Sequence, residues 1–341
     1  MRRLAPAPLV AGAAMVVSVA AALAPAPGLA APPTAQLLSY LGLKLELEAS
    51  VLKQGGVLHS AQGQNRAFPE EVAVSGAMLL VSASSTGEVI DAFLHRETFE
   101  RVHDIKRSEP LVDARVPALG VIVDLPLKAL TSTPEKHLNL SSAELASFRA
   151  IDPASPDAAA KADAAIVEVL SQRLASFREH GLSGIAPYVR DEGRARNPAA
   201  ELSEALRSLA FLANEFPGFT DEMRRPPDPG AAASHKLHWI ETAFDGKTVL
   251  ALSREAQRVQ ETSAIGADLH YYATTGYNAM LTVVGVVPYH ERWLVFALNH
   301  TFTDEVLGFS SGVKHAVARR QVAERLARHL EEVRRRVEAS R

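Results

Sequence analysis

The last third of the chain holds a run of strand-like segments with very little sequence between them. These segments span 236–244, 247–255, 267–275, 279–287 and 291–302. Asp245-Gly246, between the first two, is typical of a two-residue β-hairpin turn, because both turn positions favour positive φ. Connections this short join antiparallel neighbours, since a parallel crossover needs about a dozen residues or more. The sequence therefore predicts an antiparallel sheet here.

One long helix is expected after these strands, over 312–339. Apolar residues recur along it at helical spacing and make a single stripe: Val322, Leu326, Leu330, Val333 and Val337. Arginine and glutamate residues are mixed on the remaining faces. A basic amphipathic helix can lie on a membrane, but mixed charge favours a helix that packs on the sheet with its polar side in solvent.

Further elements are expected nearer the N-terminus. Residues 71–83 predict a strand that is apolar on both faces, which is typical of a central, covered strand. The hydroxyl residues 84–86 then cap a helix that runs to Leu94. A helix over 33–54 and a short strand over 57–59 are expected before them.

The middle of the chain, residues 108–230, has a different composition, rich in Pro, Ala and charged residues. One helix is expected from Ser155 to about Glu179, and Asn197-Pro198 starts another. The Pro-rich segment 226–230 ends the block. We therefore expect a helical insertion within an α+β core formed by 31–107 and 231–341.

This order of elements resembles the helix-grip fold of START-like and Bet v 1-like proteins. The resemblance rests on residues 72–83, 85–94, 235–302 and 312–339. It implies an α+β fold in which a curved antiparallel sheet grips the long C-terminal helix. The chain is also similar to exported bacterial proteins of unknown function that share this pattern, so we expect a divergent exported branch of the superfamily.

Residues 1–30 have the parts of a secretory signal peptide. A charged start is followed by an apolar run from Leu9 to Leu23 and by small residues at Gly28 and Ala30. The run is shorter than the ~20 residues needed to span a bilayer. We expect cleavage before Ala31, no stable transmembrane anchor, and, from the Ala- and Arg-rich composition, a bacterial periplasmic or secreted location.

Charge and motifs argue against several classes of function. The net charge of −3 becomes −5 without the two arginines of the signal (−3 − 2), whereas nucleic-acid binding needs a basic surface. The chain contains no cysteine. It also lacks the glycine-rich nucleotide motifs and the H-E-x-x-H metal motif. We expect no nucleic-acid partner, no metal and no cofactor.

The helix-grip resemblance implies an apolar cavity between the sheet and the last helix, suited to a hydrophobic small molecule or lipid. The insertion could act as its lid. Polar or aromatic residues on inward faces are the candidate ligand contacts: Arg254, His270, Tyr271, Tyr272, Phe296 and His300. Alternation places His300 beside Phe296, on the face expected to line the cavity, and His270 on the side of Tyr272. The alternative for each is a structural residue whose polar atoms the protein itself satisfies.

Three functions remain open from the sequence. The favoured one is an exported protein that binds a hydrophobic ligand without catalysis. The second is a cyclase, hydrolase or isomerase that uses the same cavity, with His300 or His270 as its base. The third is a non-catalytic envelope protein that binds a partner through the insertion.

Overall fold

The computed structural model describes residues 55–80, 85–95, 97–98, 105–111, 133–190, 195–228, 230–231, 233–244 and 246–339, together with Leu52, Val102 and Thr131. All of them belong to one compact unit that spans residues 33–341. The expected signal peptide and, except for Leu52, the helix expected over 33–54 lie outside the described residues.

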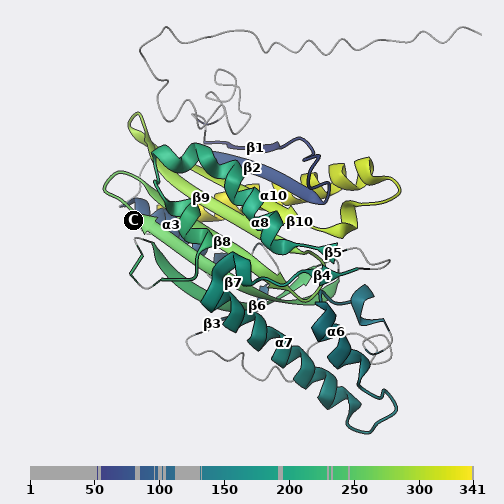
Figure 1. Cartoon of the computed structure of the whole chain (residues 1–341). Helices are drawn as coiled ribbons and strands as arrows, with labels where there is room; N and C mark the ends of the chain where they lie inside the picture. The colour runs from purple at the N-terminus through teal and green to yellow at the C-terminus, as the bar shows by residue number, and fades with distance from the viewer. Residues whose placement is uncertain are drawn as a thin grey trace, which may run out of the picture. The chain divides into compact units, whose positions relative to one another are not determined.

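The fold is α+β and is built on an eight-stranded sheet with the order β1-β2-β10-β9-β8-β7-β6-β3 (Figure 1). Its strands are β1 (Val57–Ala61), β2 (Glu71–Leu80), β3 (Ile105–Pro110), β6 (Ser234–Phe244), β7 (Lys247–Val259), β8 (Ala264–Ala273), β9 (Ala279–Tyr289) and β10 (Arg292–Phe302). Every pair of neighbours is antiparallel. The antiparallel sheet expected from the short connections is therefore confirmed, and β2 is a central strand buried along its whole length.

The helices are α3 (Thr86–Leu94), α6 (Ser142–Arg149), α7 (Ala158–His180), α8 (Pro198–Ser208), α9 (Phe219–Arg224) and α10 (Ser311–Ala339). Short 3-10 helices occupy η1 (Pro134–Lys136), η2 (Gly181–Gly184), η4 (Leu209–Asn214) and η5 (Asp304–Val306), and β4 (Tyr188–Val189) pairs with β5 (Ala195–Arg196). Ser85 and Asn197 cap α3 and α8 by accepting backbone N–H groups, as the sequence predicts. No described helix combines the length and apolar character that crossing a membrane requires.

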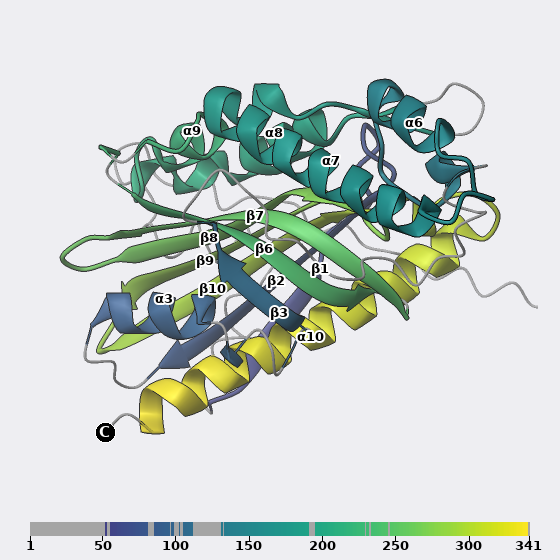
Figure 2. The ribbon, with the colours of Figure 1, turned by 90° about the horizontal axis from the view of Figure 1, so that it is seen from below.

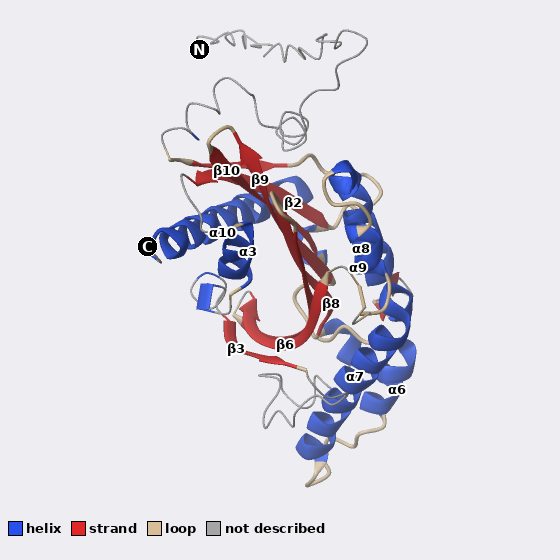
Figure 3. Ribbon diagram, turned by 90° about the vertical axis from the view of Figure 1, so that its left-hand side faces the viewer, coloured by secondary structure: helices blue, strands red, loops and turns tan. Residues whose placement is uncertain are grey.

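The sheet separates two layers of helices (Figure 2, Figure 3). Helices α3 and α10 pack on one face, towards which the sheet curves. Glycines permit this close packing, because a Cβ on Gly76 would lie 3.0 Å from Leu330 of α10. A Cβ on Gly266 would lie 2.8 Å from Ile90 of α3.

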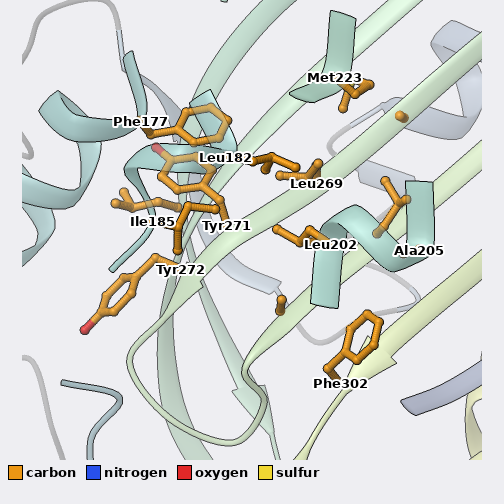
Figure 4. Packing of buried hydrophobic residues seen from close by; sticks show 14 of the residues in the cluster. Phe177, Leu182, Ile185, Leu202, Ala205, Met223, Leu269, Tyr271, Tyr272 and Phe302 are labelled. Carbon is orange, nitrogen blue, oxygen red and sulfur yellow. The ribbon is translucent and has the colours of Figure 1, made fainter. Parts of the chain in front are cut away.

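The helical insertion covers the other face of the sheet. In Figure 4, Phe177 and Leu182 of the insertion lie against Tyr271 and Leu269 of β8. Because apolar side chains of both faces are buried, the strands are apolar on both sides instead of alternating with polar residues.

Strand β3 forms one edge of the sheet. The sequence does not predict a strand at these residues. The segment reads Ile-Lys-Arg-Ser-Glu-Pro and shows no apolar alternation, so its pattern gives no strand signal. It pairs with β6, and Nε of Arg107 lies 3.1 Å from the Glu241 carboxylate. The core therefore extends to Pro110, a few residues past the expected start of the insertion at 108.

Candidate ligand-binding cavity

A cavity of about 100 Å³ lies between the sheet and α10. Its apolar walls include Phe93 of α3, Ile240 of β6, Met280 of β9 and Leu326 of α10. No described residue of the insertion helices lines it. In the described chain the insertion therefore covers the back of the sheet, whereas the cavity belongs to the face that packs on α10.

The cavity adjoins an open groove of about 670 Å³ along the first half of α10. The two spaces share four lining residues, Ala243, Thr301, Val322 and Arg325. Val313 and Val317 also line the groove and are 67% and 51% exposed. The cavity thus has a mouth with exposed apolar side chains on its helical wall.

Arg325 stands at this junction between cavity and groove. It makes no ion pair or hydrogen bond within the described part of the chain. Other arginines of α10 are paired locally, as Arg320 is with Glu324 at 2.8 Å and Arg335 with Glu332. Arg325 therefore offers its positive charge to the space between the helix and the sheet.

A chain of polar groups lies on the floor of the cavity. His270 has Nε2 2.9 Å from Oδ2 of Asp268 and Nδ1 2.6 Å from the hydroxyl of Tyr277, and all three residues are buried. Burial raises the pKa of Asp268, but the charge and hydrogen bond of His270 outweigh it and hold that pKa below its ordinary value. Burial raises the pKa of Tyr277, so this phenol stays protonated. The arrangement is that of an acid–base group oriented by a carboxylate.

A second polar chain runs across β9 and β10 on the same floor. Thr301 donates its hydroxyl hydrogen to Oδ1 of Asn299 at 2.8 Å, and Asn299 donates from Nδ2 to the Thr282 hydroxyl at 2.9 Å. All three residues are buried and line the cavity. The hydroxyl hydrogen of Thr282, at the end of the chain, has no partner in the described structure.

His329 of α10 also lines the cavity. Its Nε2 donates to the carbonyl oxygen of Phe93 at 2.9 Å, and its ring stacks on that of Phe93 with centroids 4.1 Å apart. Burial lowers the pKa of His329 to about 4, so the ring is neutral at physiological pH. His329 therefore ties α10 to α3 at the cavity wall.

Among the six sequence-predicted ligand contacts, the structure places His270 in the cavity and the others on the opposite face. Alternation grouped His300 correctly with Phe296, but this side of β10 faces the insertion. His300 has Nδ1 2.7 Å from the Glu71 carboxylate and Nε2 3.4 Å from the Ser208 hydroxyl. Its polar atoms are thus satisfied by the protein, beneath α8.

The two tyrosines of β8 depart from simple alternation. A register shift in the β7–β8 pairing pairs Leu252 with Tyr272 and Ser253 with His270, leaving Tyr271 as an extra residue. Both tyrosines therefore pack in the core under the insertion, as Figure 4 shows, and His270 points the other way. The expectation that His270 shares the side of Tyr272 is wrong because of this bulge.

Arg254 is fully buried and holds the end of α9. Its Nη1 donates to the carbonyl oxygens of Arg225 at 2.7 Å and Met223 at 3.4 Å, and its Nε donates to His235 at 3.3 Å. Burial lowers the pKa of Arg254 to about 10. The pKa of His235 is lowered to about 4, first by burial and then by the positive charge of Arg254. Arg254 therefore satisfies backbone carbonyls that the end of a helix leaves free.

The sequence pattern missed several lining residues that carry polar chemistry, among them Tyr277, Thr282, Asn299 and Arg325. Thr282 and Asn299 interrupt two apolar strands at positions paired across the sheet, which is a usable signal. Tyr277 lies in the β8–β9 turn and folds back, so strand alternation cannot find it. No group of three or more His, Cys, Asp or Glu in the described ranges is placed to hold a metal ion.

Neither a family model nor a curated protein matches the chain. Among solved structures, the chain is similar to the crystal structure of TTHA0849 from Thermus thermophilus, with 13% sequence identity and a TM-score of 0.25. The similarity covers 41% of this chain and 90% of that one.

Proposed function

We propose that this protein binds an apolar small molecule or lipid with an anionic end group, held between the sheet and α10 in a helix-grip, START-like arrangement. The strand order supports this arrangement, because β2 and β10, far apart in sequence, pair with each other and α10 packs chiefly on β2 and β1. The single observation that carries the proposal is an apolar cavity whose mouth holds an arginine, Arg325, that has no ionic partner in the described part of the chain.

The size of the site favours a ligand that uses both spaces. The inner cavity of about 100 Å³ fits only a small group, whereas the groove adds about 670 Å³. Together they fall within the roughly 300–1,000 Å³ of typical small-molecule sites. The apolar part of the ligand would pass the junction at Ala243 and Val322 and end on the apolar walls of the cavity.

The charge of Arg325 favours an anionic end group. A guanidinium beside an apolar wall gains more from a carboxylate or phosphate oxygen than from water alone, because the hydrogen bonds are charge-assisted. Groove residues nearby are mixed in sign, with Lys314 and Arg328 against Glu305 and Glu324. Arg325 is the only cation, other than histidine, among the described residues that line the inner cavity.

Binding can be tested with cis-parinaric acid, whose fluorescence rises in apolar sites, and with the uncharged cis-parinaryl alcohol. We expect wild-type protein to bind the acid more tightly, and Arg325→Gln to lose about tenfold in affinity for the acid while its affinity for the alcohol is kept. Ala243→Phe, which narrows the junction, should weaken binding of both probes. Arg335→Gln removes the same charge elsewhere on α10 and is the matched control. Failure of both probes to bind wild type would contradict the proposal.

We also propose that the mature protein acts in the periplasm or outside the cell, on the basis of the signal-peptide pattern over residues 1–30. Expression in a bacterial host and intact-mass measurement of the exported protein test this. The expected mature N-terminus is Ala31. Recovery of the chain with Met1 from the cytoplasmic fraction would contradict it.

A further inference from the structure

We propose that Tyr277, His270 and Asp268 form a proton relay, and that the cavity enolises an apolar ketone whose oxygen is bound by Thr282. This inference rests on the proposed function, because it needs an apolar ligand in the same cavity. It assigns that cavity a reaction and a substrate class beyond binding.

The relay follows from the order of its hydrogen bonds. In the tautomer whose Nε2–H donates to the Asp268 carboxylate, Nδ1 of His270 accepts the hydroxyl hydrogen of Tyr277 across 2.6 Å. The oxygen of Tyr277 stands at the end of this relay, on the cavity side, where it can take a proton from the ligand. A base within hydrogen-bond reach and oriented by a third group is the usual geometry of general base catalysis.

The insertion fixes Tyr277 from behind the sheet. Asn139 donates from Nδ2 to the carbonyl oxygens of both Ala273 and Tyr277, at 2.8 and 2.9 Å, and so holds the two ends of the β8–β9 turn. Thr303 donates to the carbonyl oxygen of Gly276 at 2.8 Å in the middle of that turn. The turn that carries the phenol is therefore held on several sides, as a positioned catalytic group requires.

Thr282 supplies the hydrogen-bond donor for the oxygen of the ketone. Its hydroxyl accepts from Asn299, which in turn accepts from Thr301, and its own hydrogen is left for a ligand. Thr282 pairs directly with Asp268 across β8 and β9, on the cavity face. His270 lies two residues along on the same face, a diagonal spacing of roughly 7–8 Å between strands. Thr282 and Tyr277 both line the cavity, so a ketone bound there with its oxygen on Thr282 can present the adjacent carbon to Tyr277.

The step balances with the groups present. The oxygen of Tyr277 takes the proton from the carbon next to the carbonyl, and the hydrogen of Tyr277 moves to Nδ1 of His270. The carbon–hydrogen electron pair becomes the carbon–carbon double bond of the enolate, whose oxygen accepts from Thr282. The imidazolium of His270 is stabilised by Asp268. Exchange of the relay proton with solvent, followed by delivery of the solvent hydrogen to the same carbon, gives isotope exchange, and delivery to another carbon of an unsaturated ketone gives isomerisation.

Hydrogen–deuterium exchange tests the relay. Cyclohexanone, β-tetralone and a decalone are incubated with the protein in deuterium oxide, and α-carbon exchange is followed by NMR. Displacement of cis-parinaric acid measures binding of each ketone in parallel. We expect exchange at least about a hundredfold faster than in buffer for a bound ketone. Tyr277→Phe should reduce exchange to the buffer rate with ketone affinity unchanged, and Thr282→Val should slow it about tenfold.

Tyr289→Phe, a tyrosine at the end of β9 that does not line the cavity, is the matched control and should keep wild-type exchange. Thermal unfolding shows that each variant is folded, and Thr282→Val carries the test if Tyr277→Phe is not. Ketone binding without faster exchange overturns the relay and leaves the proposed function intact. Exchange that survives in Tyr277→Phe also overturns it. Failure of every ketone and of cis-parinaric acid to bind overturns both.

Discussion

Phe177 of α7 stacks face to face on Tyr271 of β8, with ring centroids 3.8 Å apart and ring planes within 3° of parallel. The contact joins the longest helix of the insertion to the sheet. The hydroxyl of Tyr271 is buried without a hydrogen-bond partner in the described structure, which disfavours the folded state. The stack is therefore stabilising through its ring and not through its oxygen.

Tyr271→Phe should consequently raise the free energy of unfolding, by about 1 kcal/mol, because it removes an unsatisfied hydroxyl and keeps the stack. Tyr188→Phe is the matched comparison, since the Tyr188 hydroxyl donates to the carbonyl oxygen of Asn278 at 3.1 Å. That variant should lose about 1 kcal/mol. Urea unfolding of both variants gives the two values, and a loss of stability in Tyr271→Phe would show that its hydroxyl is satisfied.

His300→Ala should destabilise the protein by about 3 kcal/mol at neutral pH, because it removes a hydrogen-bond partner of the buried Glu71 carboxylate and leaves it only the amide of Asn65 in the described structure. Burial raises the pKa of Glu71, but the hydrogen bond and charge of His300 lower it by more. The net result is a pKa below the ordinary 4.5. The pair therefore contributes fully above pH 4.5 and its contribution is lost as the pH falls through the lowered pKa.

The loss in His300→Ala should accordingly shrink in acid. Unfolding measured from pH 3 upwards checks this, with the exposed His59→Ala as a control that changes stability by less than about 0.5 kcal/mol. Binding of cis-parinaric acid should be unchanged in His300→Ala, because this histidine lies on the face away from the cavity. A selective loss of binding in a stable variant would instead place His300 in the ligand site.

Stability should fall as the pH rises from 4.5 to about 8 because of Glu201 on α8. Burial first, and then the charge of Glu70, raise the pKa of Glu201 from 4.5 to about 8. Three carboxylates, those of Glu70, Glu201 and Asp304, are accompanied there by the guanidiniums of Arg190 and Arg196. The proton on Glu201 removes the excess negative charge.

The folded state thus holds a proton that the unfolded state releases near pH 4.5. Stability from this group is fully present below that pH and is lost as the pH rises through about 8. Glu201→Gln, which stays neutral, should flatten the decline between about pH 5 and 8. Urea unfolding of both proteins across this range makes the comparison, and parallel curves would contradict a protonated Glu201.

Gly285→Ala should be strongly destabilising, because a Cβ at Gly285 would lie 2.1 Å from the ring of Phe296 on the neighbouring strand. We expect a loss of about 3 kcal/mol from this overlap. Phe296→Leu removes the ring and should recover a substantial part of that loss in the double variant, so the two changes are not additive. A double-mutant cycle by thermal unfolding measures the coupling, and simple additivity would show that the ring moves aside freely.

The sequence predicts the element order of the sheet and of α10 because short connections and alternation are local signals. It does not decide which face of β10 meets α10. Leu298 and His300 on one side and Ala297 and Asn299 on the other are all compatible with burial once helices cover both faces. The assignment of His300 to the cavity failed for this reason. The bulge at Tyr271 defeats alternation in another way, since one extra residue reverses every later side chain.

The site itself is assembled by contacts that are far apart in sequence. Tyr277 reaches His270 because the β8–β9 turn folds back, and Asn139 of the insertion holds that turn from more than a hundred positions away. Arg325 reaches the cavity because α10 crosses the sheet at one particular register. None of these contacts can be predicted from the periodicity of the sequence. Thr282 and Asn299 can be picked out, because they are polar residues within apolar strands.

The charged edge strand β3 also has a consequence for association between molecules. A free sheet edge exposes a row of backbone donors and acceptors to which another chain can add a strand. Along β3, Lys106, Arg107 and Glu109 are exposed, and Pro110 has no N–H to donate. A second copy that approached this edge would have to strip water from these charged side chains and would meet a gap in the hydrogen-bond ladder. An eight-stranded sheet rich in valine and leucine is in this way protected at its β3 edge from growth into aggregates.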